Sequence, residues 1–500
     1  MTSTTREASL FQAFIPVLFL ILLLTVNVGL FGDTALEGSN QIVLILAAAV
    51  AALVAWRNGY TWQFLQDGIV RSISSAMGSM LILLLIGSLA GTWLLSGIVP
   101  AMIYYGLHIL NPTIFLFAAC VIASIVSVAT GSSWTTAATV GIALIGIGKA
   151  LGISEGLVTG AILSGAYFGD KMSPLSDTTN LAPAMAGTDL FTHIRYMALT
   201  TVPSISITLI IFLIIGFNLD LSSTTIETKD ILTAIDAKFY ISGWLFIVPA
   251  IVIILIVRKV PALPALLVGT LLGALFALIF QPDLVREISM SATYNGKLSD
   301  FFIRHTPDFS ALFIGTMLSL FGDISIVTSH EMVNELLSSG GMAGMLGTIW
   351  LILSAMVFGG VMESAGLLKK IAQAIMQLVH STGSLIASTV GTCFFFNLTA
   401  SDQYLAIVVP GRMYSEIYRK KGLAPENLSR SLEDSGTVTS VLIPWNTCGA
   451  YHSGVLGVST LLYAPYCFFN IISPLMSILY GYANIKIKKL ETDKSTENVS

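Results

Sequence analysis

The chain has 500 residues, of which 55% are hydrophobic and only 10% charged, and its formal net charge is −4 at pH 7. A soluble protein of this length cannot bury so much apolar surface, so the composition indicates a polytopic membrane protein. The near balance of 24 basic and 28 acidic residues carries no signature of nucleic-acid binding, and no nucleic-acid partner is expected.

Apolar runs long enough to cross a bilayer recur along the chain, and runs of roughly 17–25 residues form spanning helices. The first lacks a small-residue cleavage site and a second follows quickly, so we interpret it as a retained helix and not as a signal peptide. Two of the predicted spans, 155–190 and 432–458, are interrupted by polar residues. Together with the continuous spans they make about ten spanning helices, which predicts an all-α fold. The continuous spans lie near 11–31, 41–57, 74–96, 194–217, 238–257, 261–281, 342–363 and 459–483.

Two segments between these runs are less apolar. The hydrophilic segment 218–237 separates a first half, 1–217, from a second half, 238–485, and 486–500 forms a charged tail. Within the mixed segment 282–341, the apolar stretch 310–322 is too short to span, and we expect it at the surface.

The two halves resemble each other at a nearly constant offset. Residues 77–98 align without gaps on 346–367, with three glycines matched, at an offset of 269. The same offset places 128–133 on 397–402, and an offset of 267 places 169–175 on 436–442. Such a sustained register predicts an internal repeat.

Positive charge predicts how the two repeats are oriented. The loops around the second-half hairpin carry Lys369, Lys370, Arg419, Lys420 and Lys421, whereas the equivalent first-half loops carry only Lys149. Basic loops lie in the cytoplasm, so matched loops lie on opposite faces and the repeat is inverted. Inverted repeats are typical of secondary transporters, which bind their cargo at the midplane. We predict a multi-pass protein of the cell inner membrane with both termini cytoplasmic.

Four polar segments interrupt the apolar helices, namely 127–136, 169–189, 397–404 and 435–450. Backbone that leaves helical geometry inside a membrane is buried or lines a watery cavity. Its freed carbonyls and nearby hydroxyls suit a hard cation such as Na⁺, and half-helix N-termini suit an anion. We interpret 112–148 and 384–418 as re-entrant hairpins, although two ordinary spans in each place fit the charge pattern equally well.

One of these segments resembles a known family. GDKMSPLSDTTNLAP (169–183), followed by GTDLFTHIRYM (187–197), is similar to the signature of the NhaC family of Na⁺/H⁺ antiporters, and FGGVMESAG (358–366) resembles its second-half counterpart. The resemblance covers roughly residues 70–480. It implies a sodium-coupled secondary transporter of the ion-transporter superfamily, with paired hairpins and paired broken helices. The family also includes a malate/lactate-coupled sodium antiporter, so a small carboxylate or amino acid stays open as cargo.

Asp170 and Asp177 are the strongest candidates for the ion site. A carboxylate at membrane depth is costly unless it binds an ion, pairs with a cation or takes up a proton. For Asp170, the alternatives are a pair with Lys171 or a helix cap. Lys171 itself is either a structural counter-charge or the partner of a substrate carboxylate. We predict that Na⁺ is bound by Asp177, Thr178 and Asn180.

The other candidates are residues with polar side chains at the same four breaks. The repeat alignment pairs Asp402 with Ser133, so we expect one charged site and one neutral site to face each other. Alternatively, Asp402 packs against Arg412 or Arg419. Ser173, Thr178, Thr179 and Asn180 complete the predicted cation and proton site. Candidates at the hairpin tips and second break are Thr130, Ser132, Ser133, Asn397, Thr399, Ser401, Thr437, Thr439, Asn446 and Thr447.

Remaining polar residues are interpreted as structural. Glu433 and Asp434 are expected on a solvated face, His452 is expected to be a buried histidine with its hydrogen bonds satisfied, and Trp445 is expected to fill a helix interface. The cysteines Cys120, Cys393, Cys448 and Cys467 lack metal-ligand spacing and are expected to be buried.

Together, the sequence predicts an antiporter that exchanges cytoplasmic Na⁺ for external H⁺ by alternating access. The sequence shows no nucleophile–base pair of the kind that enzymes use for catalysis, and we expect neither a cofactor nor a resident metal. The alternative is Na⁺-coupled transport of a small organic anion or amino acid. Superfamily resemblance also implies a homodimer in the lipid bilayer.

Overall fold

The computed structural model describes residues 6–31, 34–35, 38–219, 224–290, 305–328, 334 and 337–490. These residues are mostly helical, and the strands among them are β1 (Ile324–Ser325) and β2 (Ser338–Ser339), which pair antiparallel with Ile324 opposite Ser339. By length and composition, seven of the described helices are long and apolar enough to cross a membrane, or nine if two bent pairs each count as one span. The protein is therefore an integral membrane protein.

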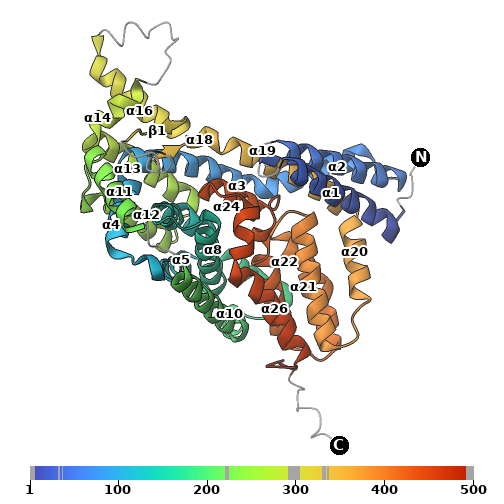
Figure 1. The fold of residues 1–500 in the computed structure, drawn as a ribbon. Coiled ribbons are helices and arrows are strands. Elements are labelled where there is room, and N and C mark those ends of the chain that lie inside the picture. Colours follow the sequence, from blue (N-terminus) through green and yellow to red (C-terminus); the bar gives the residue numbers. More distant parts are fainter. Residues whose placement is uncertain are drawn as a thin grey trace, which may run out of the picture.

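A long helix, α3 (Trp62–Leu95), organises one side of the molecule (Figure 1). At one end it packs against α19, which in turn packs against α2; at the other end α13, α16 and α18 pack on it. We call these helices and their neighbours the scaffold layer. Its other members include α1, which packs on α2, and α12 and α14, which pack on α13. The bounds are α1 (Leu10–Phe31), α2 (Ser39–Arg57), α12 (Ile247–Val257), α13 (Ala262–Phe280), α14 (Pro282–Ser289), α16 (Pro307–Phe321), α18 (Gly341–Gly344) and α19 (Leu346–Ser364).

The remaining helices form a second unit beside the scaffold layer, which we call the bundle (Figure 1). Its first part comprises α5 (Phe115–Thr130), α6 (Ser133–Thr136), α7 (Ile142–Ala150), α8 (Glu155–Met172), α9 (Asp177–Ala186) and α10 (Leu190–Asn218). Its second part comprises α21 (Thr382–Thr399), α22 (Leu405–Lys420), α23 (Pro425–Leu432), α24 (Thr447–Leu456), α25 (Thr460–Tyr463) and α26 (Phe468–Tyr482). Helices α4 (Ile98–Ile109), α11 (Thr224–Lys238) and α20 (Leu367–Met376) lie between the two units in sequence.

A close helix crossing in the bundle joins α5 to α8 and requires glycine. A Cβ atom on Gly165 would lie 2.1 Å from the carbonyl oxygen of Cys120, and one on Gly169 would lie 2.5 Å from that of Ser124. Small residues let membrane helices approach until their backbones touch. This contact holds the end of α8, where the chain breaks, against the first hairpin.

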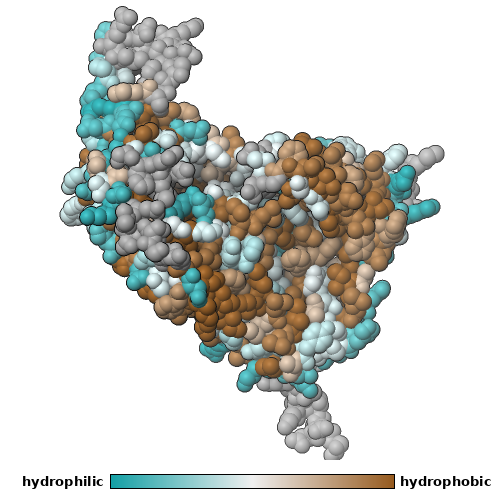
Figure 2. Space-filling model, viewed as in Figure 1, coloured by the Kyte–Doolittle hydropathy of each residue, from teal (hydrophilic) through white to brown (hydrophobic). Residues whose placement is uncertain are grey.

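The molecular surface has the pattern expected in a bilayer. Figure 2 shows a broad hydrophobic band across the visible face, with hydrophilic residues gathered at its edges. Large apolar side chains such as Phe11, Leu30 and Ile109 are more than 70% exposed, which water would disfavour and lipid does not.

Most predicted spans agree with the structure to within a few residues, and three differ. The predicted span 74–96 is the second part of a longer helix that begins at Trp62. The spans 238–257 and 459–483 are not continuous, because the chain bends by 88° and 54° within them. Stretch 310–322 falls in α16, which keeps an exposed face but also packs against α3, where the Ser88 hydroxyl donates to the Leu320 carbonyl at 2.7 Å.

The predicted interruptions are present. The first broken span consists of α8 and α9 with a break at 173–176, and the second runs from α23 through short π and 3₁₀ turns to α24. The π-helical segments are η3 (Ala137–Gly141) and η5 (Glu433–Thr437), and the 3₁₀ segments in the bundle are η2 (Pro112–Ile114), η6 (Ser440–Leu442) and η7 (Ala464–Tyr466). A further 3₁₀ turn, η4 (Gly243–Phe246), leads into α12.

Matched positions of the two halves share unusual backbone geometry. Gly97 and Gly366, 269 residues apart, both have left-handed φ angles, of 82° and 70°, and both begin a short helix. At the hairpin tips, Gly131 has φ 72° and Ser401 has φ 59°. The turn at Gly97 therefore recurs at the position that the alignment pairs with it, whereas Ser401 pairs with Ser132, one residue after Gly131.

Candidate ion-binding site

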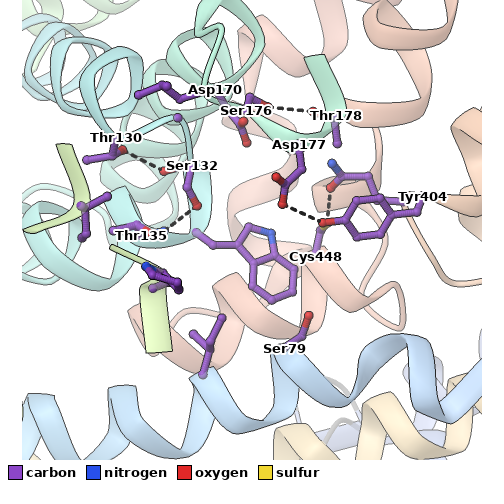
Figure 3. Close-up of a pocket in the computed structure, with 18 of the residues that line it drawn as sticks. Ser79, Thr130, Ser132, Thr135, Asp170, Ser176, Asp177, Thr178, Tyr404 and Cys448 are labelled. Atoms are coloured by element: carbon purple, nitrogen blue, oxygen red, sulfur yellow. Dashed lines mark hydrogen bonds between the residues drawn. The ribbon is translucent and has the colours of Figure 1, made fainter. Parts of the chain in front are cut away.

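The hairpin tips and helix breaks meet at a cavity of about 640 Å³ between the bundle and the scaffold layer (Figure 3). The bundle contributes residues from both hairpin tips and both breaks, and the scaffold layer contributes Ser75, Ser79 and Ile82 of α3. The α12–α13 turn completes the wall. Of the predicted site residues, the cavity is lined by Thr130, Ser132, Asp170, Asp177, Thr178, Asp402 and Thr447.

The first break exposes one carboxylate to this cavity. Ser176 caps α9 by accepting a hydrogen bond from the backbone N–H of Thr179, so Asp177 occupies the first position of the helix. Asp177 is exposed, and the hydroxyl of Tyr404 approaches its Oδ2 atom at 3.5 Å (Figure 3). A negative charge at a helix N-terminus is favourable, and this one is free to meet a cation.

Three predicted ligands at this break satisfy backbone groups instead. The Ser173 hydroxyl donates to the carbonyl of Val128 at 2.8 Å, and the Thr179 hydroxyl donates to the carbonyls at the end of α8 at 3.0 and 3.2 Å. The Asn180 amide donates to the Pro174 and Ser176 carbonyls. None of these three lines the cavity. Of the predicted Na⁺ ligands, the structure thus brings Asp177 and Thr178 to the cavity, but not Asn180.

Asp170 links the first break to the first hairpin tip. Its Oδ2 atom accepts hydrogen bonds from the backbone N–H of Ser133 at 3.1 Å and from the Ser133 hydroxyl at 2.7 Å. The side chain is 6% exposed and lines the cavity wall. The alternative pairing of Asp170 with Lys171 is wrong, because Lys171 pairs with Asp434.

Asp402 occupies the second hairpin tip. It is 4% exposed, it lines the cavity, and its Oδ1 atom accepts a hydrogen bond from the backbone N–H of Leu405 at 2.9 Å. Among the described residues, no ion pair joins it to Arg412 or Arg419.

Replacement of Asp402 by serine, which stands at the matched position as Ser133, is expected to weaken Na⁺ transport less than loss of Asp177. The carboxylate of Asp402 already accepts a backbone hydrogen bond, and serine keeps an acceptor there. Initial rates of ²²Na⁺ uptake in proteoliposomes measure the effect. Equal loss in the Asp402 and Asp177 variants would mean that both halves build one site.

The polar residues of the second break mostly bind one another. The Asn397 amide donates to the Gly436 carbonyl and the Thr439 hydroxyl, and the Asn446 amide donates to both oxygens of Asn397. The Thr399 hydroxyl donates to its own helix. These contacts hold the second hairpin against the second broken helix and leave Thr447 as the predicted residue of 435–450 that reaches the cavity.

Glu433 and Asp434 are both completely buried, so their predicted place on a solvated face is wrong. Lys171, also completely buried, donates to Asp434 and to the Ser473 hydroxyl. The other oxygen of Asp434 accepts from the hydroxyls of Thr200 and Ser477. A buried ion pair with this many hydrogen bonds joins the first broken helix to the second.

His452 differs from expectation, whereas Trp445 agrees with it. His452 is buried among aromatic rings, but neither ring nitrogen has a hydrogen-bond partner in the described part of the chain, so the prediction of a satisfied histidine is wrong. The Trp445 indole donates to the Leu398 carbonyl at 2.8 Å. It therefore braces the second hairpin, as a residue that fills an interface does. The four cysteines are buried, as predicted.

Sequence reasoning missed several residues of the cavity wall. Ser75, Ser79 and Ile82 share one face of α3 because they are spaced by four and three residues, a pattern that many membrane helices show. Other residues that it did not assign to the site are Trp134, Thr135, Lys259, Gln403, Tyr404 and Cys448. Trp134, Gln403 and Tyr404 lie inside predicted polar breaks, and this position could have identified them as site residues.

The charge of the cavity favours cations. Three carboxylates, of Asp170, Asp177 and Asp402, line it, and Lys259 is the basic residue in its described wall. Opposite charges 4 Å apart attract by about 1 kcal/mol in water and about 4 kcal/mol at the effective dielectric near a protein surface. Carboxylate and hydroxyl oxygens are also the ligands that hard cations prefer.

A helical membrane protein whose paired helix breaks surround a carboxylate-lined cavity has the organisation of an ion-coupled secondary transporter. The comparisons with known proteins agree. A family model described as the Na⁺/H⁺ antiporter family matches residues 165–485, and the chain belongs to this family.

Curated relatives match nearly the whole chain. It is 37% identical to the Na(+)/H(+) antiporter NhaC of Alkalihalophilus pseudofirmus, over 91% of this chain and 92% of that one. It is also 37% identical to the malate-2H(+)/Na(+)-lactate antiporter of Bacillus subtilis, over 95% of each chain. The arginine/ornithine antiporter ArcD of Halobacterium salinarum is 33% identical, over 98% of this chain and 96% of that one. All three are named as antiporters and not as enzymes.

Proposed function

We propose that this protein is a secondary active Na⁺/H⁺ antiporter that exchanges cytoplasmic Na⁺ for external H⁺ by alternating access. The observation that carries the proposal is the cavity itself, since three carboxylates from the breaks and hairpin tips line one space between bundle and scaffold layer. Family membership supports the same reading, because two relatives at 33–37% identity are named Na⁺/H⁺ antiporters.

In this proposal Na⁺ binds at Asp177, with the Thr178 hydroxyl and Asp170 close by. A proton on Asp177 or Asp170 removes the negative charge that holds Na⁺, so the two ions compete. The bundle then carries the loaded site past the fixed face of α3 and opens it to the other side. The hydrogen-bonded residues at the breaks, such as Thr179 and Asn397, keep the site in shape as it moves.

The same proposal includes the topology. Residues 1–217 and 238–485 form two inverted repeats, joined by 218–237, with about ten spans and two re-entrant hairpins. The recurrent left-handed turns at Gly97 and Gly366 support the repeat. The basic loops support cytoplasmic termini in the cell inner membrane. A homodimer is part of the proposal through family resemblance alone.

Purified protein in liposomes tests this function directly. An inward Na⁺ gradient is imposed at clamped voltage, with a pH dye inside and no organic solute. Exchange of entering Na⁺ for leaving H⁺ raises the luminal pH. A luminal pH that does not respond to Na⁺, in liposomes that hold folded protein, would contradict the proposal.

The exchange is expected to depend on pH through competition. As pH falls, more of the site carboxylates are protonated and fewer are free to bind Na⁺. The Na⁺ concentration that gives half-maximal rate should therefore rise as pH falls, by up to about tenfold for each pH unit where one proton competes with one Na⁺. Uptake of ²²Na⁺ at pH 6, 7 and 8 measures this. A half-maximal concentration that stays constant over this range would exclude competition.

Transport of an organic cargo is the second candidate, because the cavity is larger than an ion requires. At about 640 Å³ it falls in the range of small-molecule pockets, and Lys259 in its wall can neutralise a carboxylate. Malate, lactate and arginine are added in turn to the liposome assay. If protons move with Na⁺ only after one of them is added, the sodium site is coupled to that cargo.

A further inference from the structure

A second acidic group lies directly behind the cavity wall. Glu433 is the first residue of η5 in the second broken helix, and its side chain is completely buried. Its Oε1 atom accepts a hydrogen bond from the Thr178 hydroxyl at 3.0 Å. Its Oε2 atom has no hydrogen-bond partner in the described part of the protein, and neither has the hydroxyl of Thr437, four residues further along η5.

Among the described residues, no basic side chain forms an ion pair with Glu433. The nearest arginine in sequence, Arg430 on α23, is also buried, but its guanidinium lies over the rings of Tyr196 and Tyr480. The charged side chains that act on Glu433 are Asp170 and Lys171 at the end of α8, with Asp434 beside it. Lys171 already forms its ion pair with Asp434. The helices α21, α22 and α26, which also pack against η5, face it with uncharged side chains: Cys393, Ile407, Ser473 and Ser477.

An ionised Glu433 would therefore be a buried charge with one hydrogen bond and an acidic neighbour, Asp170. Such a charge costs several kcal/mol, whereas a neutral carboxylic acid does not. A neutral acid also has an O–H donor for the atom that otherwise lacks a partner. The surroundings of Glu433 thus favour a bound proton whenever no cation is close.

Thr178 connects this acid to the cavity. Its hydroxyl contacts Glu433, and the same residue lines the cavity beside Asp177 (Figure 3). The acid proton can sit on either carboxyl oxygen. When Oε1 carries it, this O–H donates to the Thr178 oxygen while the hydroxyl's own proton passes to cavity water, so one proton leaves Glu433 and one enters the water. The backbone around Glu433 is π-helical, a local geometry that recurs at functional sites.

We propose that Glu433 is a second proton-binding site of the exchanger, separate from the cavity carboxylates, whose proton reaches the cavity through the Thr178 hydroxyl. Entry of Na⁺ at Asp177 brings a positive charge next to Thr178. This charge stabilises the Glu433 carboxylate once its proton has left. This inference rests on the proposed Na⁺/H⁺ exchange and adds one proton to it.

The test compares wild type with Glu433→Gln, whose side chain is always neutral and still accepts from Thr178. Liposomes hold a fixed pH gradient at zero voltage, and the Na⁺ gradient at which net flux reverses gives the number of protons exchanged per Na⁺. The variant is expected to exchange one proton fewer per Na⁺ than wild type. Its ²²Na⁺/Na⁺ exchange should stay within about threefold of wild type, since the cation site is intact.

Two further variants control for folding and chemistry. Glu426→Gln makes the same change at another buried glutamate, two helical turns earlier, whose partner is Lys488, and should leave the ratio unchanged. Glu433→Asp keeps a titratable acid and should keep the wild-type ratio at a reduced rate.

Three outcomes would overturn the proposal. An unchanged ratio in Glu433→Gln would show that no proton travels on Glu433, and loss of ²²Na⁺/Na⁺ exchange in that variant would place Glu433 in the cation site itself. A reduced ratio in Glu426→Gln as well would show that the change is not specific to Glu433. Failure of the wild type to exchange Na⁺ for H⁺ is a separate result, and it contradicts the proposed function.

Discussion

The Asp177→Asn variant is expected to lose Na⁺-driven proton movement while the protein stays folded in the membrane. Asp177 is exposed to the cavity, and its described side-chain contact is the long approach of Tyr404 at 3.5 Å. Loss of a charge at the start of α9 costs only about 0.3–1 kcal/mol of stability. Loss of its attraction for Na⁺ removes about 1–4 kcal/mol of binding, or roughly five- to a thousandfold in affinity.

Two measurements check this expectation. Na⁺-dependent luminal alkalinisation reports exchange, and the increase of the melting temperature with added Na⁺ reports binding to folded protein. Both should be reduced in Asp177→Asn at Na⁺ concentrations near the wild-type half-maximal value, by an amount that follows this loss of affinity. Exchange at the wild-type rate would remove Asp177 from the site.

Asp189→Asn is a matched control twelve residues further on. Asp189 caps α10, and the hydroxyl and backbone N–H of Thr192 hold the pKa of its carboxyl below the ordinary value. It is therefore ionised throughout the assay range and does not exchange protons. Asparagine caps helices as well as aspartate does, so this variant should retain exchange and stability. Parallel losses in both variants would indicate a general effect of removing charge.

The sequence was sufficient to predict the helix breaks, because a polar, proline-containing stretch such as 169–189 stands out between apolar runs. It also predicted one cation and proton site with Asp170, Asp177 and Asp402, and in the structure all three line the same cavity. Bends were harder to predict. The span 238–257 reads as one apolar run, and its 88° bend depends on the cap that Ser242 gives to a new helical turn.

The burial of Glu433 and Asp434 could not be predicted from the local sequence. Glu433 and Asp434 follow Ser429, Arg430 and Ser431, a composition typical of a solvated face. Their burial depends on partners far away in the chain, since Lys171 is 263 residues from Asp434 and Thr178 is 255 residues from Glu433. Local patterns predict where a helix breaks, but pairing across the two halves appears only in three dimensions.

The other large expected effect concerns the buried ion pair between Lys171 and Asp434. Lys171→Met alone should destabilise the protein by about 3–5 kcal/mol, because it leaves Asp434 as an unpaired buried charge. Asp434→Asn alone should cost a similar amount by leaving Lys171 unpaired. The double variant removes both charges, and the asparagine still accepts hydrogen bonds from Thr200 and Ser477. It should therefore be more stable than either single variant.

Thermal unfolding of the four proteins in detergent completes this double-mutant cycle, and a coupling energy near zero would contradict the structural role of the pair. Transport by the double variant then distinguishes the two roles that the sequence leaves open for Lys171. Since Lys171 is completely buried and donates to Asp434 and Ser473, we expect it to be a structural counter-charge. The double variant should then regain exchange together with stability. If stability returns but exchange does not, Lys171 takes part in binding the cargo.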